Sequence, residues 1–208
     1  MDLDRQFDRA VRKGLLGTLM AALPGLDLRL LAGIRLQELV KVGLNRGIGY
    51  AEKGDLERAI ADFTEAIRIA PDYADAYFNR GKAYFGKGDF DKAIADYSEA
   101  IRLRPDYADA YCARGCAYGN KGDLDRAIAD CTEAIRLMPD HVAAYCGRGF
   151  AYSNNGDLDK AIADYSEAIR FKPDFATAYN FRGNAYDRKG EKRKAEADLA
   201  EAKRLGYS

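Results

Sequence analysis

Apolar residues recur along most of the chain with the spacing of amphipathic helices. Tyr77, Gly81 and Tyr84 are four and three residues apart, which places them on one face of a helix. Ala93 and Tyr97 are again four apart. The pattern therefore predicts two amphipathic helices in succession.

Residues typical of helix ends separate these two predicted helices. Gly88 suits a left-handed helix end, and Asp89 suits the cap of the second helix. Pro105 stops the second helix, and Asp106 is placed to cap the helix that follows. The predicted Asp cap recurs at Asp55, Asp123 and Asp157.

The same pattern repeats every 34 residues. The glycine column is Gly47, Gly81, Gly115, Gly149 and Gly183. A tyrosine column is Tyr50, Tyr84, Tyr118, Tyr152 and Tyr186. Two alanine columns are Ala59, Ala93, Ala127, Ala161 and Ala195, and Ala66, Ala100, Ala134, Ala168 and Ala202. Such a period is typical of a repeat protein built from helical hairpins.

The repeating unit resembles the tetratricopeptide repeat, with its aromatic, glycine, alanine and proline columns. Five units in register occupy residues 40–73, 74–107, 108–141, 142–175 and 176–208. Because the small Gly and Ala residues allow close helix approach, and because one short hairpin cannot bury its apolar face alone, the units should stack. We expect an all-α, open, right-handed α-solenoid.

An arginine precedes the glycine in every unit, and an aspartate recurs in every second helix. The arginines are Arg46, Arg80, Arg114, Arg148 and Arg182, and the aspartates are Asp62, Asp96, Asp130, Asp164 and Asp198. We predict that each arginine pairs with the aspartate of its own hairpin. The alternative is two independent solvated charges, which contribute under about 1 kcal/mol even when they touch.

Residues 1–39 do not fit the repeat and form a separate leader with two predicted helices, the second running into the first repeat. We interpret the leader as a cap on the exposed end of the solenoid. Residues 14–26 also resemble the uncharged core of a signal peptide, but the acidic Asp2, Asp4 and Asp8 precede it where such a peptide has basic residues. A helix lying on a membrane surface is the other alternative, although its polar face mixes both charges.

Composition argues against several classes of function. The chain has 33 basic and 33 acidic residues, so no overall field attracts nucleic acid or an anionic membrane. The single histidine, His141, excludes metal motifs that need two histidines, and it stands in a turn column where a packed residue is expected. We therefore predict a cytoplasmic, non-enzymatic protein without cofactors that binds neither nucleic acid nor membrane.

Three of the four cysteines are predicted to project from neighbouring first helices onto one concave surface of the solenoid. Cys112 and Cys116 are one helical turn apart, and Cys146 lies one repeat after Cys112. Three thiolates would suit a soft metal such as Cu(I) or Zn²⁺, although a fourth ligand is missing. Small polarisable packing residues are the alternative. Cys131 replaces an aromatic ring of the core and is interpreted as structural.

In tetratricopeptide repeat proteins the first helices line a concave groove that binds a peptide or a helix of a partner. By that resemblance the groove residues here are Asn45, Phe78, Asn79, Lys82, Phe85, Cys112, Cys116, Asn120, Phe150, Asn154, Asn180, Asn184 and Arg188. Relatives that bind a chaperone's C-terminal carboxylate use a Lys, Asn and Arg clamp, of which this chain keeps only Asn79. The resemblance thus favours a neutral or apolar peptide of another protein.

We therefore expect a protein-interaction scaffold or adaptor. Phe78, Phe85 and Phe150 are the expected anchors for partner side chains, with packing between first helices as the alternative. A soft-metal or redox carrier based on Cys112 and its two neighbours is a second hypothesis. Self-association by end-to-end stacking of the solenoid is a third.

Overall fold

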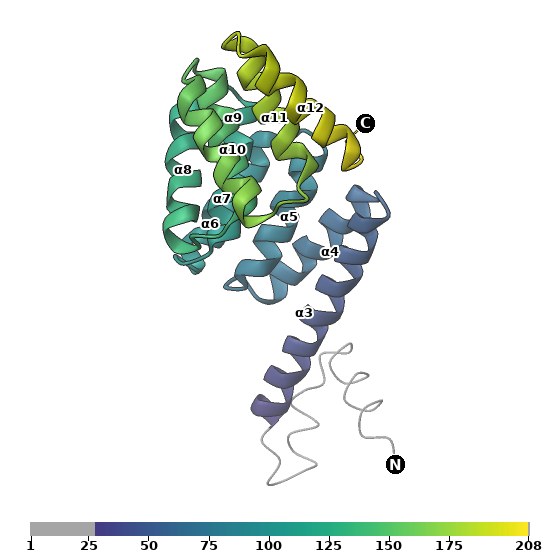
Figure 1. Ribbon diagram of the computed structural model, residues 1–208. Helices are drawn as coiled ribbons and strands as arrows, with labels where there is room; N and C mark the ends of the chain where they lie inside the picture. Colours follow the sequence, from purple (N-terminus) through teal and green to yellow (C-terminus); the bar gives the residue numbers. More distant parts are fainter. Residues whose placement is uncertain (1–27, 208) are drawn as a thin grey trace.

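The computed structural model describes residues 28–207, which form ten helices and no strand. In chain order these are α3 (Leu28–Glu52), α4 (Leu56–Ile69), α5 (Ala74–Gly86), α6 (Phe90–Leu103), α7 (Ala108–Asn120), α8 (Leu124–Leu137), α9 (Val142–Asn154), α10 (Leu158–Phe171), α11 (Ala176–Arg188) and α12 (Lys192–Arg204). Consecutive helices pack as hairpins, and the hairpins follow one another in a curved stack (Figure 1). The predicted all-α solenoid is confirmed.

The turns within the hairpins use the predicted glycines. Gly88 has φ +80°, a left-handed conformation that glycine adopts without the steric penalty of a side chain. Its counterparts with positive φ are Gly54, Gly122, Gly156 and Gly190.

The aspartate caps are confirmed in only two places. The carboxylates of Asp55 and Asp123 accept hydrogen bonds from the backbone N–H of the residue three positions on. Asp89 stands at the N-cap position without such a bond, and its carboxylate binds the Lys92 ammonium at 3.1 Å instead. Asp157 pairs with a lysine in the same way.

The cap predicted at Asp106 is wrong. Tyr107 occupies the N-cap position of α7, without a side-chain hydrogen bond. The backbone carbonyl of Asp106 accepts from the N–H of Ala108 at 3.0 Å. The helix thus begins one residue later than the cap rule implied.

Close packing explains the glycine column. A Cβ on Gly81 would lie 2.7 Å from the ring of Tyr97, and one on Gly149 would lie 2.7 Å from the ring of Tyr165. Both tyrosines are almost completely buried, and so is the alanine column beside them. Any larger residue in the glycine column would push the two helices of a hairpin apart.

The first helices of the hairpins form the inner layer of the curve. Each of α3, α5, α7 and α9 contacts the first helix of the next hairpin, whereas second helices of neighbouring hairpins make no comparable contact within residues 28–207. Neighbouring hairpins therefore lie closer together on the side of their first helices than on the side of their second helices. We call the solvent side of α3, α5, α7, α9 and α11 the inner face.

The two ends of the solenoid differ. α3 is one continuous helix of 25 residues, so the boundary expected at residue 39 falls inside it. Its last part packs on α4 as the first helix of the first repeat through the buried Val40 and Leu44. Residues 1–27, which include the signal-like stretch at 14–26, lie outside the described residues.

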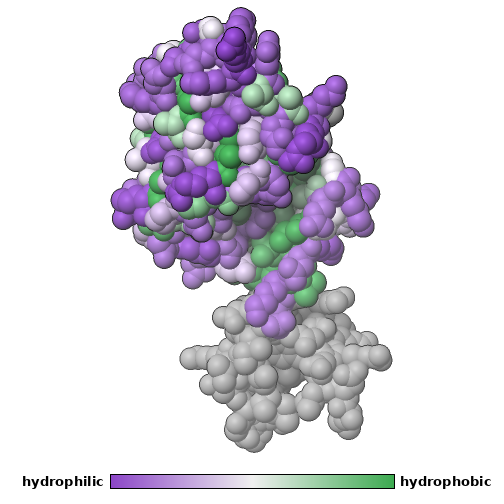
Figure 2. All heavy atoms as spheres, viewed as in Figure 1, coloured by the Kyte–Doolittle hydropathy of each residue, from purple (hydrophilic) through white to green (hydrophobic). Residues whose placement is uncertain are grey.

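α12 carries charges where the earlier second helices carry apolar residues. Lys192, Glu196 and Lys203 are exposed at the positions that Leu158, Ile162 and Ile169 hold in α10, where they pack against the core. The outer side of α12 is therefore not built to receive another hairpin. The view in Figure 2 is mostly hydrophilic over the repeats, with apolar residues in narrow strips.

Candidate functional site

Every predicted arginine–aspartate pair forms. In each hairpin the Nε and Nη2 atoms of the arginine donate to the two carboxylate oxygens at 2.7 to 2.9 Å. The pairs are Arg46–Asp62, Arg80–Asp96, Arg114–Asp130, Arg148–Asp164 and Arg182–Asp198. All these aspartates except Asp62 are buried. The alternative of independent solvated charges is thus excluded for the four pairs whose aspartate is buried.

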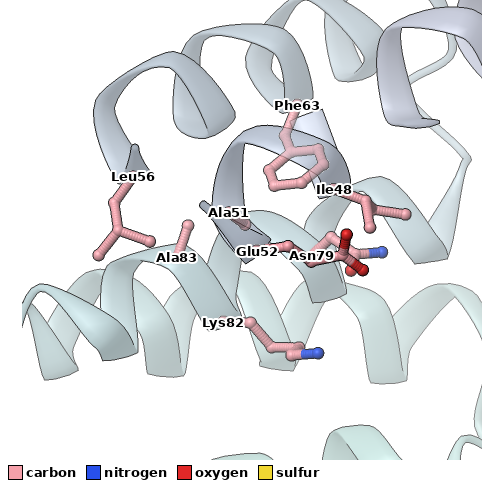
Figure 3. A pocket seen from close by; sticks show the side chains of 8 residues that line it. All are labelled: Ile48, Ala51, Glu52, Leu56, Phe63, Asn79, Lys82 and Ala83. Carbon is pink, nitrogen blue, oxygen red and sulfur yellow. The ribbon is translucent and has the colours of Figure 1, made fainter. Parts of the chain in front are cut away.

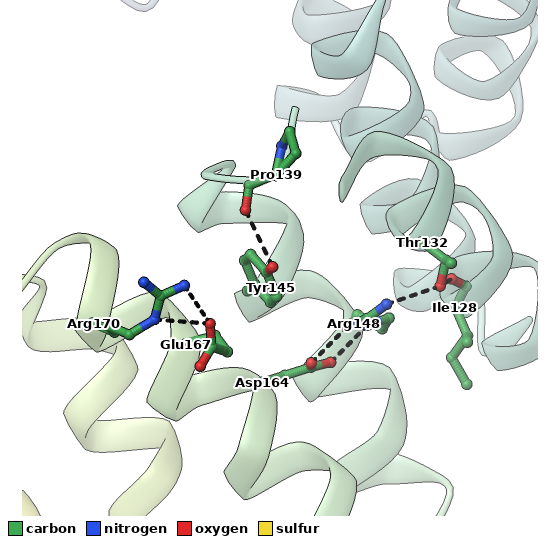
Figure 4. Close-up of polar contacts among 8 residues, drawn as sticks. All are labelled: Ile128, Thr132, Pro139, Tyr145, Arg148, Asp164, Glu167 and Arg170. Carbon is green, nitrogen blue, oxygen red and sulfur yellow. Dashed lines mark hydrogen bonds and ion pairs between the residues drawn. The ribbon is translucent and has the colours of Figure 1, made fainter. Parts of the chain in front are cut away.

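A contact that the sequence analysis missed joins neighbouring repeats. Nη1 of Arg148 donates to the hydroxyl of Thr132 in the preceding hairpin at 3.2 Å, and that hydroxyl donates to the carbonyl of Ile128 at 2.7 Å (Figure 4). The same bond links Arg80 to Thr64, Arg114 to Ser98 and Arg182 to Ser166. The guanidinium groups of these arginines therefore bind both within their hairpin and to the preceding hairpin, and they are not free to bind a ligand.

The predicted groove residues divide by exposure. Exposed residues are Asn45, Lys82, Asn120, Phe150, Asn154, Asn184 and Arg188; partly buried ones are Phe78, Asn79, Phe85, Cys116 and Asn180; Cys112 is buried. All of them lie on first helices. The exposed set spans the inner face from α3 to α11.

Only one of the three expected phenylalanine anchors is exposed. Phe150 has 41% of its surface exposed. Phe78 instead packs between the rings of Tyr97 and Tyr107, with centroid distances of 5.9 and 4.9 Å. Phe85 packs edge-on against Phe90 at 5.4 Å. Phe78 and Phe85 are thus partly buried and not exposed as expected, because aromatic rings of neighbouring helices pack against them. Their role as anchors stays a prediction.

Several polar groups of the inner face already bind their own chain. The amide N–H of Asn79 donates to the carbonyl of Asp75 at 2.7 Å, and that of Asn120 donates to the carbonyl of Cys116 at 2.9 Å. Arg188 donates to the carbonyl and the hydroxyl of Ser153. The side-chain oxygens of both asparagines remain as acceptors.

The cysteines do not form the open wall that their spacing indicated. Cys112 and Cys146 are buried, and the predicted structural cysteine, Cys131, lies beside Cys116: a Cβ on Gly147 would be 3.1 and 3.4 Å from their two sulfurs. Burial raises the pKa of Cys146 to about 12. The pKa of Cys116 is raised further by a hydrogen bond with Cys112 and by burial.

Cys112 and Cys146 are thus packed inside the solenoid and are not open to solvent. Within the described part of the chain, no three His, Cys, Asp or Glu side chains are arranged to hold a metal ion. The geometry does not support the soft-metal hypothesis, and the packing interpretation fits the observed burial.

His141 is the packed turn residue that the repeat register indicated, with 9% of its surface exposed. Its Nδ1 accepts a hydrogen bond from the N–H of Ala144 at 3.3 Å and caps α9. Nε2 lies 3.1 Å from a carboxylate oxygen of Asp109. Since Nδ1 accepts, the ring proton sits on Nε2 and is donated to Asp109.

A pocket of about 320 Å³ lies between α3, α4 and α5 (Figure 3). The apolar side chains that line it are Ile48, Ala51, Leu56, Phe63 and Ala83. The polar side chains that line it are Glu52, Asn79 and Lys82. Asn79 and Lys82 were among the predicted groove residues, but the pocket itself was not foreseen.

The fold and the inner face define a class of protein: an α-solenoid of helical hairpins in which the first helices present a continuous surface. Models described as tetratricopeptide repeat match residues 108–141 and 176–205, and one described as TPR repeat matches residues 49–88, 82–122 and 154–190. The chain belongs to the tetratricopeptide repeat family. A search of curated proteins found no match.

Solved structures agree with this assignment. A crystal structure of MamA is 30% identical, with TM-score 0.67, and the match covers 76% of this chain and 93% of that one. MamA from Desulfovibrio magneticus RS-1, 20% identical, has TM-score 0.70 over 80% and 94% of the two chains. YrrB, described as a TPR protein with an unusual peptide-binding site, is 23% identical with TM-score 0.61 over 79% and 84%. The last two share the fold.

No helix among residues 28–207 is both long and apolar enough to cross a membrane.

Proposed function

We propose that this protein is a non-enzymatic scaffold that binds a peptide segment of another protein along its inner face. The observation that carries the proposal is Phe150, a large apolar ring with 41% of its surface exposed on a first helix. Exposed rings on an otherwise polar surface are typical anchors for a partner's side chains. Asn154 and Asn184, both exposed, supply neutral hydrogen-bonding groups on the same face.

The distribution of charge supports the same face. On the second helices of the hairpins, charged side chains three residues apart form ion pairs, as in Arg102 with Glu99 and Arg170 with Glu167. Such pairs leave little net charge for a partner. Of the predicted groove residues, the exposed ones are four asparagines, Phe150, Lys82 and Arg188. Asparagine side chains can hydrogen-bond to a peptide backbone, so binding does not require a terminal carboxylate on the peptide.

Membership of the family also supports the proposal, because tetratricopeptide repeat proteins generally bind other proteins. YrrB, which shares the fold, is described by its peptide-binding site. Self-association by end-to-end stacking has less support, because the outer side of α12 carries exposed Lys192 and Glu196.

The test is a selection of random phage-displayed peptides on the full chain, followed by affinity measurements with synthetic versions of the selected peptides. We expect dissociation constants in the micromolar range, and a loss of about tenfold or more for Phe150→Ala, because an anchoring ring is removed. Met138→Ala is the matched control, since Met138 is equally exposed, at 42%, but is the C-cap residue of α8 and does not lie on a first helix.

Equal affinity of both variants would show that the peptides bind elsewhere. Failure to select any peptide that binds the folded chain would contradict the proposal as a whole. Circular dichroism establishes that the variants remain folded.

A further inference from the structure

The pocket between α3, α4 and α5 lies where the second repeat has an aromatic ring and the first repeat has an alanine. Ala51 stands one repeat before Phe85, whose ring packs against Phe90 with a centroid distance of 5.4 Å. In the first repeat the corresponding neighbours are Ala51 and Leu56, and both line the pocket. The space that an aromatic ring fills in the second repeat is therefore open in the first.

The open space is apolar and large enough for a ligand group. Its volume of about 320 Å³ lies at the lower end of the range of ligand pockets, about 300–1,000 Å³. Phe63, which contributes to the lining, is 1% exposed and fixed in the core. An aromatic or large aliphatic side chain entering here would bury its apolar surface against walls that already have their shape.

Two opposite charges and one acceptor accompany this apolar space. Glu52, at the end of α3, and Lys82, on α5, are both exposed, and among the described residues neither takes part in an ion pair. The Lys82 ammonium lies 5.7 Å from the centroid of the Phe78 ring. Figure 3 shows the Lys82 ammonium apart from the Glu52 carboxylate. Since the Asn79 amide donates to Asp75, its oxygen remains as an acceptor. Many other exposed charges of the described chain are paired.

We propose that this pocket binds one aromatic or large aliphatic side chain of a partner peptide, which also carries an acidic residue facing Lys82 and a basic residue facing Glu52. The proposal rests on the function proposed above and adds the chemistry of the partner: one apolar anchor flanked by charges of opposite sign. Complementary charges of this kind set the direction of a bound peptide more than its affinity.

The first arm of the test fills the pocket. Peptides selected from a random phage-displayed library on the full chain are synthesised with a fluorescent label and titrated by fluorescence polarisation. Ala51→Phe places a ring where Phe85 has one in the next repeat, and we expect it to weaken binding about tenfold or more. Ala61→Phe is the matched control: the same substitution in the same hairpin, at an exposed outer position.

The second arm exchanges the charges. In the double variant Glu52→Lys and Lys82→Glu, both changed side chains are exposed, so the fold is retained. We expect the original peptide to bind at least about tenfold less tightly, since each wild-type attraction becomes a repulsion. A peptide whose acidic and basic residues are interchanged should recover the lost affinity on the exchanged variant.

The outcomes separate this proposal from the function on which it rests. If Ala51→Phe and the exchanged variant bind the selected peptides as wild type does, while Phe150→Ala binds them weakly, the pocket assignment is overturned and the inner-face function stands. If no peptide binds the folded chain, both fail. If an uncharged peptide of residues 14–26 binds in a manner sensitive to Ala51→Phe and the selected peptides do not, the occupant is the chain's own leader, which also overturns the proposal.

Discussion

Replacing Arg114 by Ala tests whether the ladder of arginines holds the solenoid together. In the folded chain the guanidinium of Arg114 binds both oxygens of Asp130 at 2.7 and 2.8 Å and the hydroxyl of Ser98 at 3.0 Å. The side chains of Arg114 and Asp130 are only 19% and 11% exposed. The substitution leaves the Asp130 carboxylate without its cation and the Ser98 hydroxyl without its donor.

The expected loss follows from the burial of the carboxylate. Removing one partner of a buried ion pair costs about 3–5 kcal/mol, and we take about 3 kcal/mol because water reaches one side of Arg114. For a chain of this length each kcal/mol lowers the melting temperature by about 2–4 °C, so the expected decrease is about 6–12 °C. The assay is thermal unfolding followed by circular dichroism.

The pH of the assay is not critical near neutrality. The hydrogen bond to Asp130 raises the pKa of the Arg114 guanidinium above its ordinary value. A group whose pKa is raised on folding contributes its full stabilisation at every pH below its unfolded pKa. The arginine's contribution is therefore complete at neutral pH, and a buffer change between pH 7 and 8 should not alter the effect of the substitution.

Arg46→Ala is the matched control within the same chain. Arg46 makes the same two-pronged contact, at 2.7 Å to each oxygen of Asp62, but its side chain is 62% exposed. Solvent screens such a pair, so its loss should lower the melting temperature much less. Equal, small decreases for Arg46→Ala and Arg114→Ala would show that burial of the pair contributes nothing to stability, contrary to this prediction.

Two further predictions concern the packing and the thiols. Gly81→Ala should lower the melting temperature, because the added Cβ would lie 2.7 Å from the buried Tyr97 ring. Gly49→Ala should raise the melting temperature, because nothing lies within 4 Å of its Cβ and alanine is more favourable than glycine in a helix by about 1 kcal/mol. Thermal melts of both variants check this, and equal shifts would contradict it. Burial raises the pKa of Cys146 to about 12, so its thiol and that of the buried Cys112 should resist iodoacetamide at pH 8 in the folded chain. Both thiols should react in denaturant, and mass spectrometry measures the alkylation. Rapid alkylation of the native protein would contradict this prediction.

The fold could be predicted from the sequence because its determinants repeat. Gly81 has a glycine at the equivalent position of every unit, and in each unit that glycine packs against a side chain of the second helix, which is Tyr97 in the second unit and Cys131 in the third. The pairing of Arg80 with Asp96 was equally predictable, since both columns recur within each hairpin. The hydroxyl that Arg80 also contacts was missed because Thr64 belongs to the preceding repeat, and spacing within one unit does not show contacts between units.

The candidate site was less predictable, because exposure depends on the neighbouring rings. Phe78 and Phe150 both lie on first helices, one turn apart in the repeat register, and their positions alone do not distinguish them. Tyr107 covers Phe78, whereas Phe150 remains 41% exposed. The pocket beside Ala51 was not predictable from its repeat position, because only Phe85 carries a ring there and the later repeats have Gly119, Ser153 and Asp187.

The most direct measurement of the central claim is a map of where a selected peptide contacts the protein. An NMR titration of the isotope-labelled full chain with such a peptide reports on each backbone amide. We predict that the shifts concentrate on first helices, around Lys82, Asn120, Phe150 and Asn184, while the amides of α4, α6, α8 and α10 that face away from the first helices stay unchanged. Shifts confined to those outer helices, or to residues 1–27, would contradict it.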